Sequence, residues 1–355
     1  MLSLLAGWLA VTTAYAGKVS YAADGHAYNP VFSPDGRTIA FEVNPYQGNV
    51  DLYLAGLAGT EPKGQAVKVS LPGTSSKFGG RGHVAASPVW HPDGLVIFEA
   101  SNPGGKYRLY YRQGLRGSAA ELISSKSISG NLTSATLSPD GHRLAFVTDA
   151  SGQAEIQIRD TQTNKTTPLT RSPEAESYPM FSTDGKRLVF QRKRNSSEDV
   201  FEIEVTSGVE RQVAGGGGDQ TRPIYGADGA VLFFDGSRGE EHWDLVSIVN
   251  GKTRVLAKDV RLPLRARPAL SADGRYVAFA YADPTKSKKV MIARVDGSRT
   301  VALETPFTAV GEPAFGQQGP RTLLAYTALP GEGSDWRFLY VVDVSDKVDS
   351  NAKTP

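Results

Sequence analysis

Short apolar runs recur along the chain, and a tight-turn signal precedes each of them. The clearest are residues 38–43, 143–147 and 276–280, in which nearly every position is apolar. A strand exposed on one face alternates apolar and polar residues, whereas a strand covered on both faces reads as continuously apolar. The pattern therefore predicts strands that are packed on both sides.

A phrase of the form Pro-x-apolar-Ser-x-Asp-Gly precedes these runs. The Asp-Gly pair favours the left-handed backbone of a tight hairpin, so each phrase predicts a strand, a turn and the next strand. A degenerate seventh copy occupies residues 313–319. We expect structural turns at the Asp and Gly of the other six copies: Asp35 and Gly36, Asp93 and Gly94, Asp140 and Gly141, Asp184 and Gly185, Asp228 and Gly229, and Asp273 and Gly274.

The spacing of the phrases predicts the architecture. Their glycines stand at positions 36, 94, 141, 185, 229, 274 and 319, and a period of about 45 residues is that of a four-stranded propeller blade. The fold class predicted is all-β: a seven-bladed β-propeller of four-stranded antiparallel blades. The first interval is longer than the rest, and we interpret its excess, residues 56–82, as a long loop between the first two blades.

The two ends of the chain complement each other. The last repeat lacks an outer strand, and a strand over residues 18–22 is left over before the first phrase, so we expect the N-terminal strand to close the ring. Residues 1–16 contain an apolar run from Leu4 to Val11, followed by Ala14-Tyr15-Ala16. This pattern predicts a cleaved signal peptide, although no Lys or Arg precedes the run. The expected organisation is signal peptide 1–16, propeller 17–345 and flexible tail 346–355.

Composition narrows the functional classes. Of 355 residues, 39 are Lys or Arg and 37 are Asp or Glu, and no basic block tracks a phosphate backbone, so we expect no nucleic-acid partner. The chain has no Cys, which excludes disulfides and thiolate chemistry. No Gly-x-Ser-x-Gly elbow or phosphate loop occurs. We predict no cofactor, no membrane span after signal cleavage, and a periplasmic or secreted location.

Residues that differ at equivalent positions are the candidates for function. One residue immediately precedes the Pro, or Ala135, of each phrase and should face the central mouth of the ring. These channel-rim residues are Asn29, Ser87, Ser134, Tyr178, Arg222, Arg267 and Glu312. Two interpretations stay open: a recognition surface for a partner, or a rim that is polar because water fills the channel.

Within that rim, Tyr178, Arg222 and Arg267 come from consecutive blades and should form a cationic and aromatic arc. Such an arc favours a carboxylate-bearing segment of a partner, and the loop over residues 56–82 would fold over the rim opposite it. On this hypothesis, replacing both Arg residues with Ala abolishes partner capture and leaves the melting temperature nearly unchanged.

The repeat resembles the TolB-type propeller family in its Ser-Pro-Asp-Gly phrase, in the apolar strand that follows and in the Asp/Glu-Ile/Leu start of the third strand. The resemblance covers roughly residues 18–345. It implies a stand-alone propeller without the N-terminal α/β domain of TolB. It also favours a non-catalytic protein- or peptide-binding propeller of the bacterial cell envelope, with a structural spacer in an envelope complex as a further alternative.

A catalytic alternative also follows from the resemblance, because some seven-bladed sugar-acid lyases similar to this family hold a divalent metal with several His residues. On this alternative hypothesis, the protein is a metal-assisted polysaccharide lyase of the oligogalacturonate type or another enzyme that acts on a small substrate. His26 and His83 are the weak candidate ligands, with Glu174, Glu176 and Asp219 as additional oxygen ligands; solvated loop histidines are the alternative. Residues 192–194 are expected to form a solvated, cationic hairpin tip.

Overall fold

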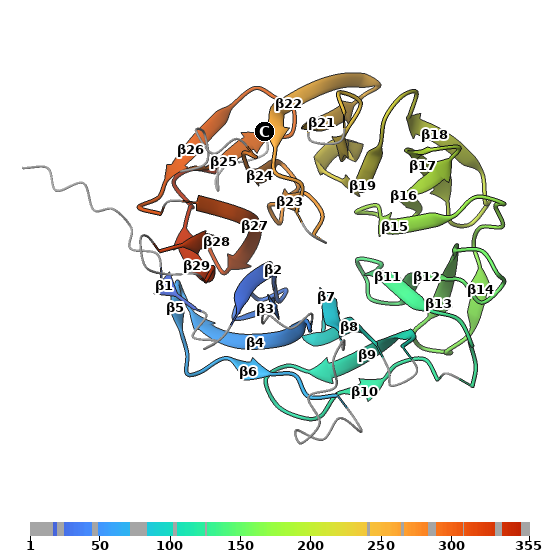
Figure 1. Ribbon diagram of the computed structural model, residues 1–355, viewed down its shortest axis with the longest axis horizontal. Helices are drawn as coiled ribbons and strands as arrows, with labels where there is room; N and C mark the ends of the chain where they lie inside the picture. The colour runs from blue at the N-terminus through green and yellow to red at the C-terminus, as the bar shows by residue number, and fades with distance from the viewer. Residues whose placement is uncertain are drawn as a thin grey trace, which may run out of the picture.

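In the computed structural model, seven antiparallel sheets are arranged as a ring around a central axis (Figure 1). The structure describes residues 17–19, 25–44, 49–71, 84–101, 105–124, 126–239, 242–263, 266–282, 289–307, 309–330 and 336–348. Within these ranges the regular structure is β-strand, apart from one 3-10 turn, η1 (Ala227–Gly229). The predicted fold class is confirmed, down to the number of blades.

Each blade takes its innermost strand first, and the following strands lie progressively further from the axis. Blade 1 contains β2 (His26–Phe32), β3 (Thr38–Asn44), β4 (Asp51–Ala58), β5 (Glu61–Pro62) and β6 (Val67–Lys68). Blade 2 contains β7 (Ala85–Trp90), β8 (Leu95–Ser101), β9 (Tyr107–Gln113) and β10 (Ala120–Glu121). Blade 3 contains β11 (Leu132–Leu137), β12 (Arg143–Thr148), β13 (Glu155–Asp160) and β14 (Thr166–Pro168).

The remaining blades repeat this order. Blade 4 contains β15 (Glu176–Phe181), β16 (Arg187–Arg194), β17 (Ser197–Glu204) and β18 (Glu210–Ala214). Blade 5 contains β19 (Gln220–Tyr225), β20 (Val231–Asp235), β21 (Trp243–Val249) and β22 (Lys252–Val260). Blade 6 contains β23 (Ala269–Leu270), β24 (Tyr276–Ala280), β25 (Lys289–Arg294) and β26 (Thr300–Glu304). Blade 7 contains β27 (Ala309–Gln318), β28 (Arg321–Leu329), β29 (Phe338–Asp343) and β1 (Gly17–Lys18).

The repeated phrase is explained by a side-chain bridge across its turn. Ser138 donates its hydroxyl to Asp140, and the same carboxylate accepts the backbone N–H of His142. The Ser138 hydroxyl oxygen in turn accepts the N–H of Arg143. These hydrogen bonds, the one from Ser138 first, hold the pKa of Asp140 below its usual range. Equivalent Ser-to-Asp bonds recur in blades 1, 4 and 6, so the Ser and Asp of the phrase are structural.

The core lies between the blades. The five central residues of β3, Ile39 to Val43, are all buried, because one face packs on blade 7 and the other on blade 2. Phe41 joins Leu323 and Val341 of blade 7 in one cluster, and Ala40 joins Val96 of blade 2 in another. Burial on both faces accounts for the continuously apolar runs of the sequence.

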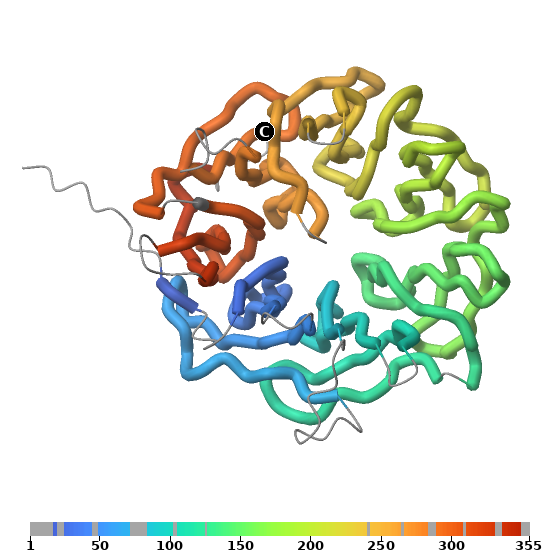
Figure 2. The backbone as a smooth tube through the Cα atoms, in the orientation of Figure 1, coloured from blue at the N-terminus to red at the C-terminus, as the bar shows by residue number. Residues whose placement is uncertain are grey.

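The ring closes through the N-terminal segment, as predicted. β1 pairs with β29, through Gly17 opposite Val341 and Lys18 opposite Tyr340, and Figure 2 shows this segment beside the last blade. The pairing starts one residue earlier than expected, and residues 20–22 of the predicted strand lie outside the described residues. At the other end Val348, placed in the expected tail, is buried and packs in the cluster between blades 6 and 7.

The prediction of one long loop over residues 56–82 is wrong for its first part. Residues 56–71 form the outer edge of blade 1, because β5 and β6 both pair with β4. Lys68 on β6 donates to the Asp51 carboxylate over 2.7 Å, which fixes this edge. The strands lie at the periphery of the ring (Figure 1), away from the mouth, and residues 72–82 lie outside the described residues.

Loss of the closing strand should be costly, because it removes the pairing of β1 and the buried Val19 side chain and exposes two strand edges. We expect a chain that begins at Asp24 to aggregate or to melt well below a chain that begins at Gly17, as measured by circular dichroism and light scattering. Equal melting temperatures would show that the ring closes without β1.

The turn glycines allow a matched test of blade contact. Gly36 and Gly94 occupy the same turn position, with φ of +66° and +80°. A Cβ atom added to Gly36 would lie 2.3 Å from the Gln317 carbonyl oxygen of blade 7, whereas a Cβ atom added to Gly94 would have no other atom within 4 Å apart from those of its chain neighbours. Gly94→Ala should cost about 1 kcal/mol from the left-handed backbone alone. Gly36→Ala should cost about 2 kcal/mol more, measured by denaturant unfolding; equal losses would contradict the tight contact.

Candidate functional site

In six blades the residue before the Pro, or Ala135, of the phrase lies at a bulge in the innermost strand. The strand register shifts there in six blades, as between Tyr28 and Val31 in blade 1. Six of the seven predicted rim residues have a left-handed backbone, with φ between 45° and 56°: Asn29, Ser87, Ser134, Tyr178, Arg222 and Glu312. Non-glycine residues avoid this conformation at a cost of roughly 1 kcal/mol or more, so the ring stores strain around its axis.

Side chains of the preceding blade hold three of these bulges in place. Glu42 accepts the backbone N–H of Ser87 over 2.9 Å, and Glu99 accepts that of Ser134 over 2.7 Å. Gln191 accepts the N–H of Arg222 over 2.9 Å. The sequence analysis missed these acceptors, although a signal was present, since each is a polar residue that directly follows the Phe of an apolar run.

A cavity of about 620 Å³ lies on the axis between the innermost strands. Five of the predicted rim residues line it: Asn29, Ser87, Ser134, Tyr178 and Arg267. Much of the remaining wall is apolar or aromatic, with Phe32, Trp90, Tyr107, Met180 and Phe315, and both Glu42 and Glu99 contribute to the lining. A concave, mostly apolar site with a few convergent polar groups is typical of ligand-binding cavities.

Asn29 is the most conspicuous polar group of this wall. Its side chain is only 2% exposed, and neither amide atom, Oδ1 or Nδ2, has a hydrogen-bond partner among the residues that the structure describes. A buried amide without partners costs on the order of 1–3 kcal/mol. Both atoms are shielded from solvent, so this cost falls on the fold beside the cavity.

The expected arc of Tyr178, Arg222 and Arg267 is present. Both guanidinium carbons lie 5.5 Å from the centre of the Tyr178 ring. Arg267 of blade 6 extends past blade 5 to blade 4. There it donates to the carbonyl oxygens of Tyr178 over 3.0 Å and Pro179 over 2.8 Å. Burial lowers the pKa of Arg267 to about 10, so it remains a cation at neutral pH.

These contacts correct the expectation that the two Arg residues can be removed without loss of stability. Arg222 is only 8% exposed, lies outside the cavity wall, and donates to the carbonyl oxygens of Pro263 and Ala266. Arg222 binds the connection between blades 5 and 6, and Arg267 binds blade 4. Ala in place of either residue therefore leaves buried carbonyl groups without donors. The arc therefore acts as a structural clamp.

Glu312, the remaining rim residue, lies outside the cavity wall and is buried beside blade 1. Burial raises its pKa to about 7, against the opposing charges of Arg261 and Arg337, while Glu42 raises it further. Its Oε2 accepts the Thr327 hydroxyl over 3.4 Å.

The structure does not bring the weak metal candidates together in the described residues. The His26 ring lies against Trp336, and its Nδ1 accepts the backbone N–H of Arg337; His83 lies outside the described residues. Asp219 accepts the N–H of Glu198, and Glu174 accepts the Ser172 hydroxyl. Within the described ranges, no three His, Asp or Glu side chains are grouped as metal ligands would be.

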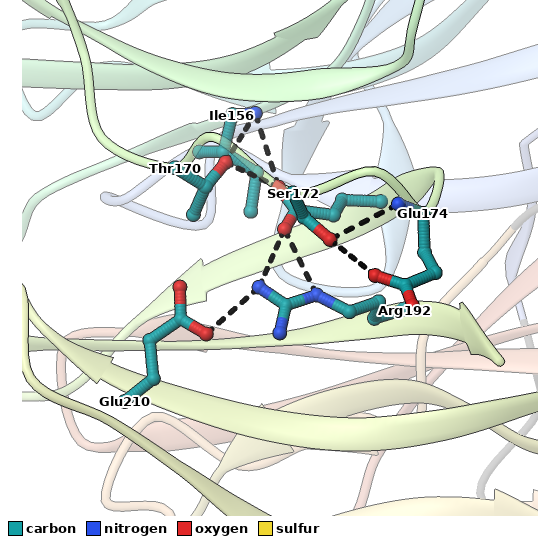
Figure 3. Close-up of polar contacts among 7 residues, drawn as sticks. Ile156, Thr170, Ser172, Glu174, Arg192 and Glu210 are labelled. Carbon is teal, nitrogen blue, oxygen red and sulfur yellow. Dashed lines mark hydrogen bonds and ion pairs between the residues drawn. The ribbon is translucent and has the colours of Figure 1, made fainter.

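Glu176 and Arg192 form a buried pair (Figure 3). Arg192 donates Nε and Nη2 to the Glu176 carboxylate over 3.1 and 2.7 Å, and Nη2 also to Glu210 over 2.8 Å. Thr170 donates its hydroxyl to the other oxygen of Glu176. Arg192 is thus not part of a solvated tip as predicted; only Lys193 and Arg194 of residues 192–194 are exposed.

A family profile described as the TolB β-propeller domain matches residues 122–319. This chain belongs to the TolB β-propeller domain family. An uncharacterised protein of Agrobacterium fabrum is 30% identical over 160 residues, and an uncharacterised peptidase of Bacillus subtilis is 28% identical over 151 residues. These matches cover 42% and 40% of this chain, but only 54% and 20% of the two relatives.

Solved structures agree on the fold. An oligogalacturonate lyase from Vibrio parahaemolyticus is similar with a TM-score of 0.64 at 12% identity, over 94% of this chain and 95% of that one. An oligogalacturonate lyase in complex with manganese has a TM-score of 0.60 at 14% identity, over 90% and 89%. At such identities the likeness shows the fold alone. Among the described residues, no helix has the length and hydropathy needed to cross a membrane.

The raised pKa of Glu312 has a consequence for stability. Between about pH 4.5 and 7 the folded protein retains a proton on Glu312 that the unfolded chain has lost, so this residue makes stability fall as pH rises through that window. Wild type should lose on the order of 2 kcal/mol more than Glu312→Gln between pH 5 and 8, measured by urea unfolding at both values. Parallel pH profiles of the two proteins would contradict the buried, protonated carboxyl.

Proposed function

We propose that this protein is a non-catalytic binding module of the bacterial cell envelope, periplasmic or secreted, which takes a segment of a protein partner into the mouth of its central channel. The observation that carries the proposal is the axial cavity, whose wall combines aromatic side chains with five of the polar or charged rim residues. Membership of the TolB β-propeller domain family and the signal-like residues 1–16 support the location.

Size and shape favour an extended polypeptide segment as the occupant. A volume of about 620 Å³ is in the range of cavities that enclose a few side chains or a small ligand. Trp90, Tyr107 and Phe315 offer broad apolar faces, and aromatic groups of this kind give much contact area at low entropic cost. Because the seven blades differ at the mouth, the ring offers an asymmetric surface to an asymmetric partner.

Blocking the cavity tests the proposal. Thr133 is half-buried in the cavity wall, so Thr133→Trp should fill the mouth while leaving the clamp of Arg222 and Arg267 intact. We expect it to lose most of the partner that immobilised wild type captures from envelope extracts of the source organism, as quantified by mass spectrometry. Thr300→Trp, on the exposed outer strand of blade 6, is the matched control and should retain capture. Equal capture by both variants would place the binding face elsewhere.

A further inference from the structure

The outer strand of blade 5, β22, differs from the other outer strands in length. It runs for nine residues, whereas β18 and β26 have five and the remaining outer strands have three or fewer. β22 is the last strand of its sheet, and among the described residues no further strand pairs with residues 252–258. Such an edge presents N–H and C=O groups to which another extended segment can add.

β22 also differs in charge. Five charged side chains of the other outer strands are paired within their own blades: Lys68 with Asp51, Glu121 with Arg108, Glu210 with Arg192, Arg211 with Glu202 and Glu304 with Lys289. On β22 the single carboxylate, Asp259, is paired with Arg238. Lys252, Arg254 and Lys258 are exposed, and within the part of the chain that the structure describes none of them has an ion-pair partner. This edge therefore carries positive charge that its own blade does not balance.

The register of β22 with β21 places the cations and the apolar residues on opposite faces. Arg254 pairs with Ser247, whose hydroxyl donates to the Val295 carbonyl oxygen of blade 6 over 2.8 Å. Arg254 and Lys252 therefore lie on the face toward blade 6, because alternate residues of a strand share a face. Val255, which is 50% exposed, lies on the face toward blade 4. A segment added to this edge alternates between the same two faces.

The space between neighbouring blades is filled in most of the ring by a side chain of the outer segment. In five blades the residue opposite the buried centre of the third strand is a Val or Leu that packs against the next blade. These residues are Val69, Leu122, Leu169, Leu303 and Val19. In blade 5 the equivalent residue is Ala257, and Leu256 and Leu262 pack into the same cluster.

Blade 4 alone lacks such a side chain among these positions. Its equivalent residue is Ala214, and Gly215 and Gly216 follow it. A groove of about 570 Å³ lies there between blades 4 and 5, lined by these three residues, by apolar side chains that include Phe233, and by Thr253 of β22. The groove is thus continuous with the Thr253 and Val255 face of the edge strand, and the other blades show that a Val or Leu side chain suits this position.

We propose that β22 and the groove beside it bind an extended segment of a protein partner in which acidic and apolar residues alternate. The segment adds to β22 as a further strand, with its carboxylates toward Lys252 and Arg254 and an apolar side chain in the groove next to Thr253. A second copy of this chain is a poor occupant, because two β22 edges would bring like charges together. The surface lies at the periphery of the ring (Figure 1), so it is separate from the mouth and does not depend on the proposed function.

Synthetic peptides test the preference for this pattern. In fluorescence anisotropy at low ionic strength, a short labelled peptide that alternates Glu and Val should bind wild type with a Kd at least about tenfold lower than two comparison peptides. One alternates Lys and Val, and the other has the same Glu and Val residues in two blocks. Added salt should weaken the binding. Equal binding of the three peptides, or no binding of the Glu-Val peptide, would overturn the proposal.

N-methyl groups on alternate residues of the Glu-Val peptide test strand addition. Methylation of the residues whose N–H groups face β22 removes main-chain hydrogen bonds, whereas methylation of the other residues leaves these bonds in place. One of the two methylation patterns should therefore abolish binding, and the other should retain it. Equal binding of the two methylated peptides would contradict a strand on this edge.

Variants assign the binding to the residues. K252Q/R254Q should bind the Glu-Val peptide at least about tenfold more weakly, whereas K193Q/R194Q, which removes the same charge from an exposed hairpin of blade 4, should bind as wild type. A214L supplies the side chain that Leu169 and Leu303 supply in other blades, so it should fill the groove and weaken binding severalfold without lowering the melting temperature. Unchanged affinity in K252Q/R254Q or in A214L contradicts the assignment.

Two further measurements separate this surface from other sites. Sedimentation velocity of wild type should show a monomer; self-association that K252Q/R254Q abolishes would assign the edge to a second copy and overturn the proposal. Thr133→Trp, which blocks the mouth, should bind the Glu-Val peptide as wild type does. Loss of peptide binding in Thr133→Trp would place the peptide in the mouth and overturn the peripheral surface, while the proposed function would stand.

Discussion

Packing of whole sheet faces against one another is the constraint on which this structure depends. Each blade buries both faces of its second strand, as β3 does with Phe41 toward blade 7 and Ala40 toward blade 2. No blade can satisfy this requirement alone, because a sheet with two apolar faces needs a neighbour on each side. The ring is the arrangement that gives every blade two neighbours, and the two-residue strand β1 completes it by giving blade 7 its fourth strand.

The same packing drives the innermost strands together at the axis, where a regular strand is interrupted by a bulge. The left-handed backbone at residues such as Ser87 and Tyr178 costs free energy in every blade where it occurs. That cost is offset in different ways around the ring: by a carboxylate in blades 1 and 2, by an amide in blade 4 and by Arg267, which binds the Tyr178 carbonyl oxygen. A repeated backbone device thus leaves side-chain chemistry free to differ, and that difference gives the cavity its polarity.

Charged groups at the mouth divide into those that hold the ring and those that face the cavity. Arg222 binds backbone beyond its own blade, and Arg192 is paired with Glu176, so both contribute to cohesion. Glu42 and Glu99 line the cavity and also accept bulge N–H groups, a role that the neutral Gln191 has in blade 4. The seven blades of one chain therefore show which residue types the fold tolerates at one position, as homologous sequences usually do.

The sequence by itself determined the repeat, the number of blades, the turns and the exchange of a strand between the two ends. The turns follow from contacts within a few residues, as in the Ser-x-Asp-Gly bridge. The blade number follows because that local signal recurs about every 45 residues. It also located the rim residues, since each immediately precedes the proline, or Ala135, of a repeated phrase. The sequence did not show which of them face the cavity. Only the tertiary structure decided that Arg267 crosses blade 5 to reach Tyr178 and Pro179, that Glu312 is buried, and that Glu42 and Glu99 share one wall with Asn29. These outcomes depend on contacts between residues tens of positions apart, whose geometry is set by how the blades pack and not by any local pattern.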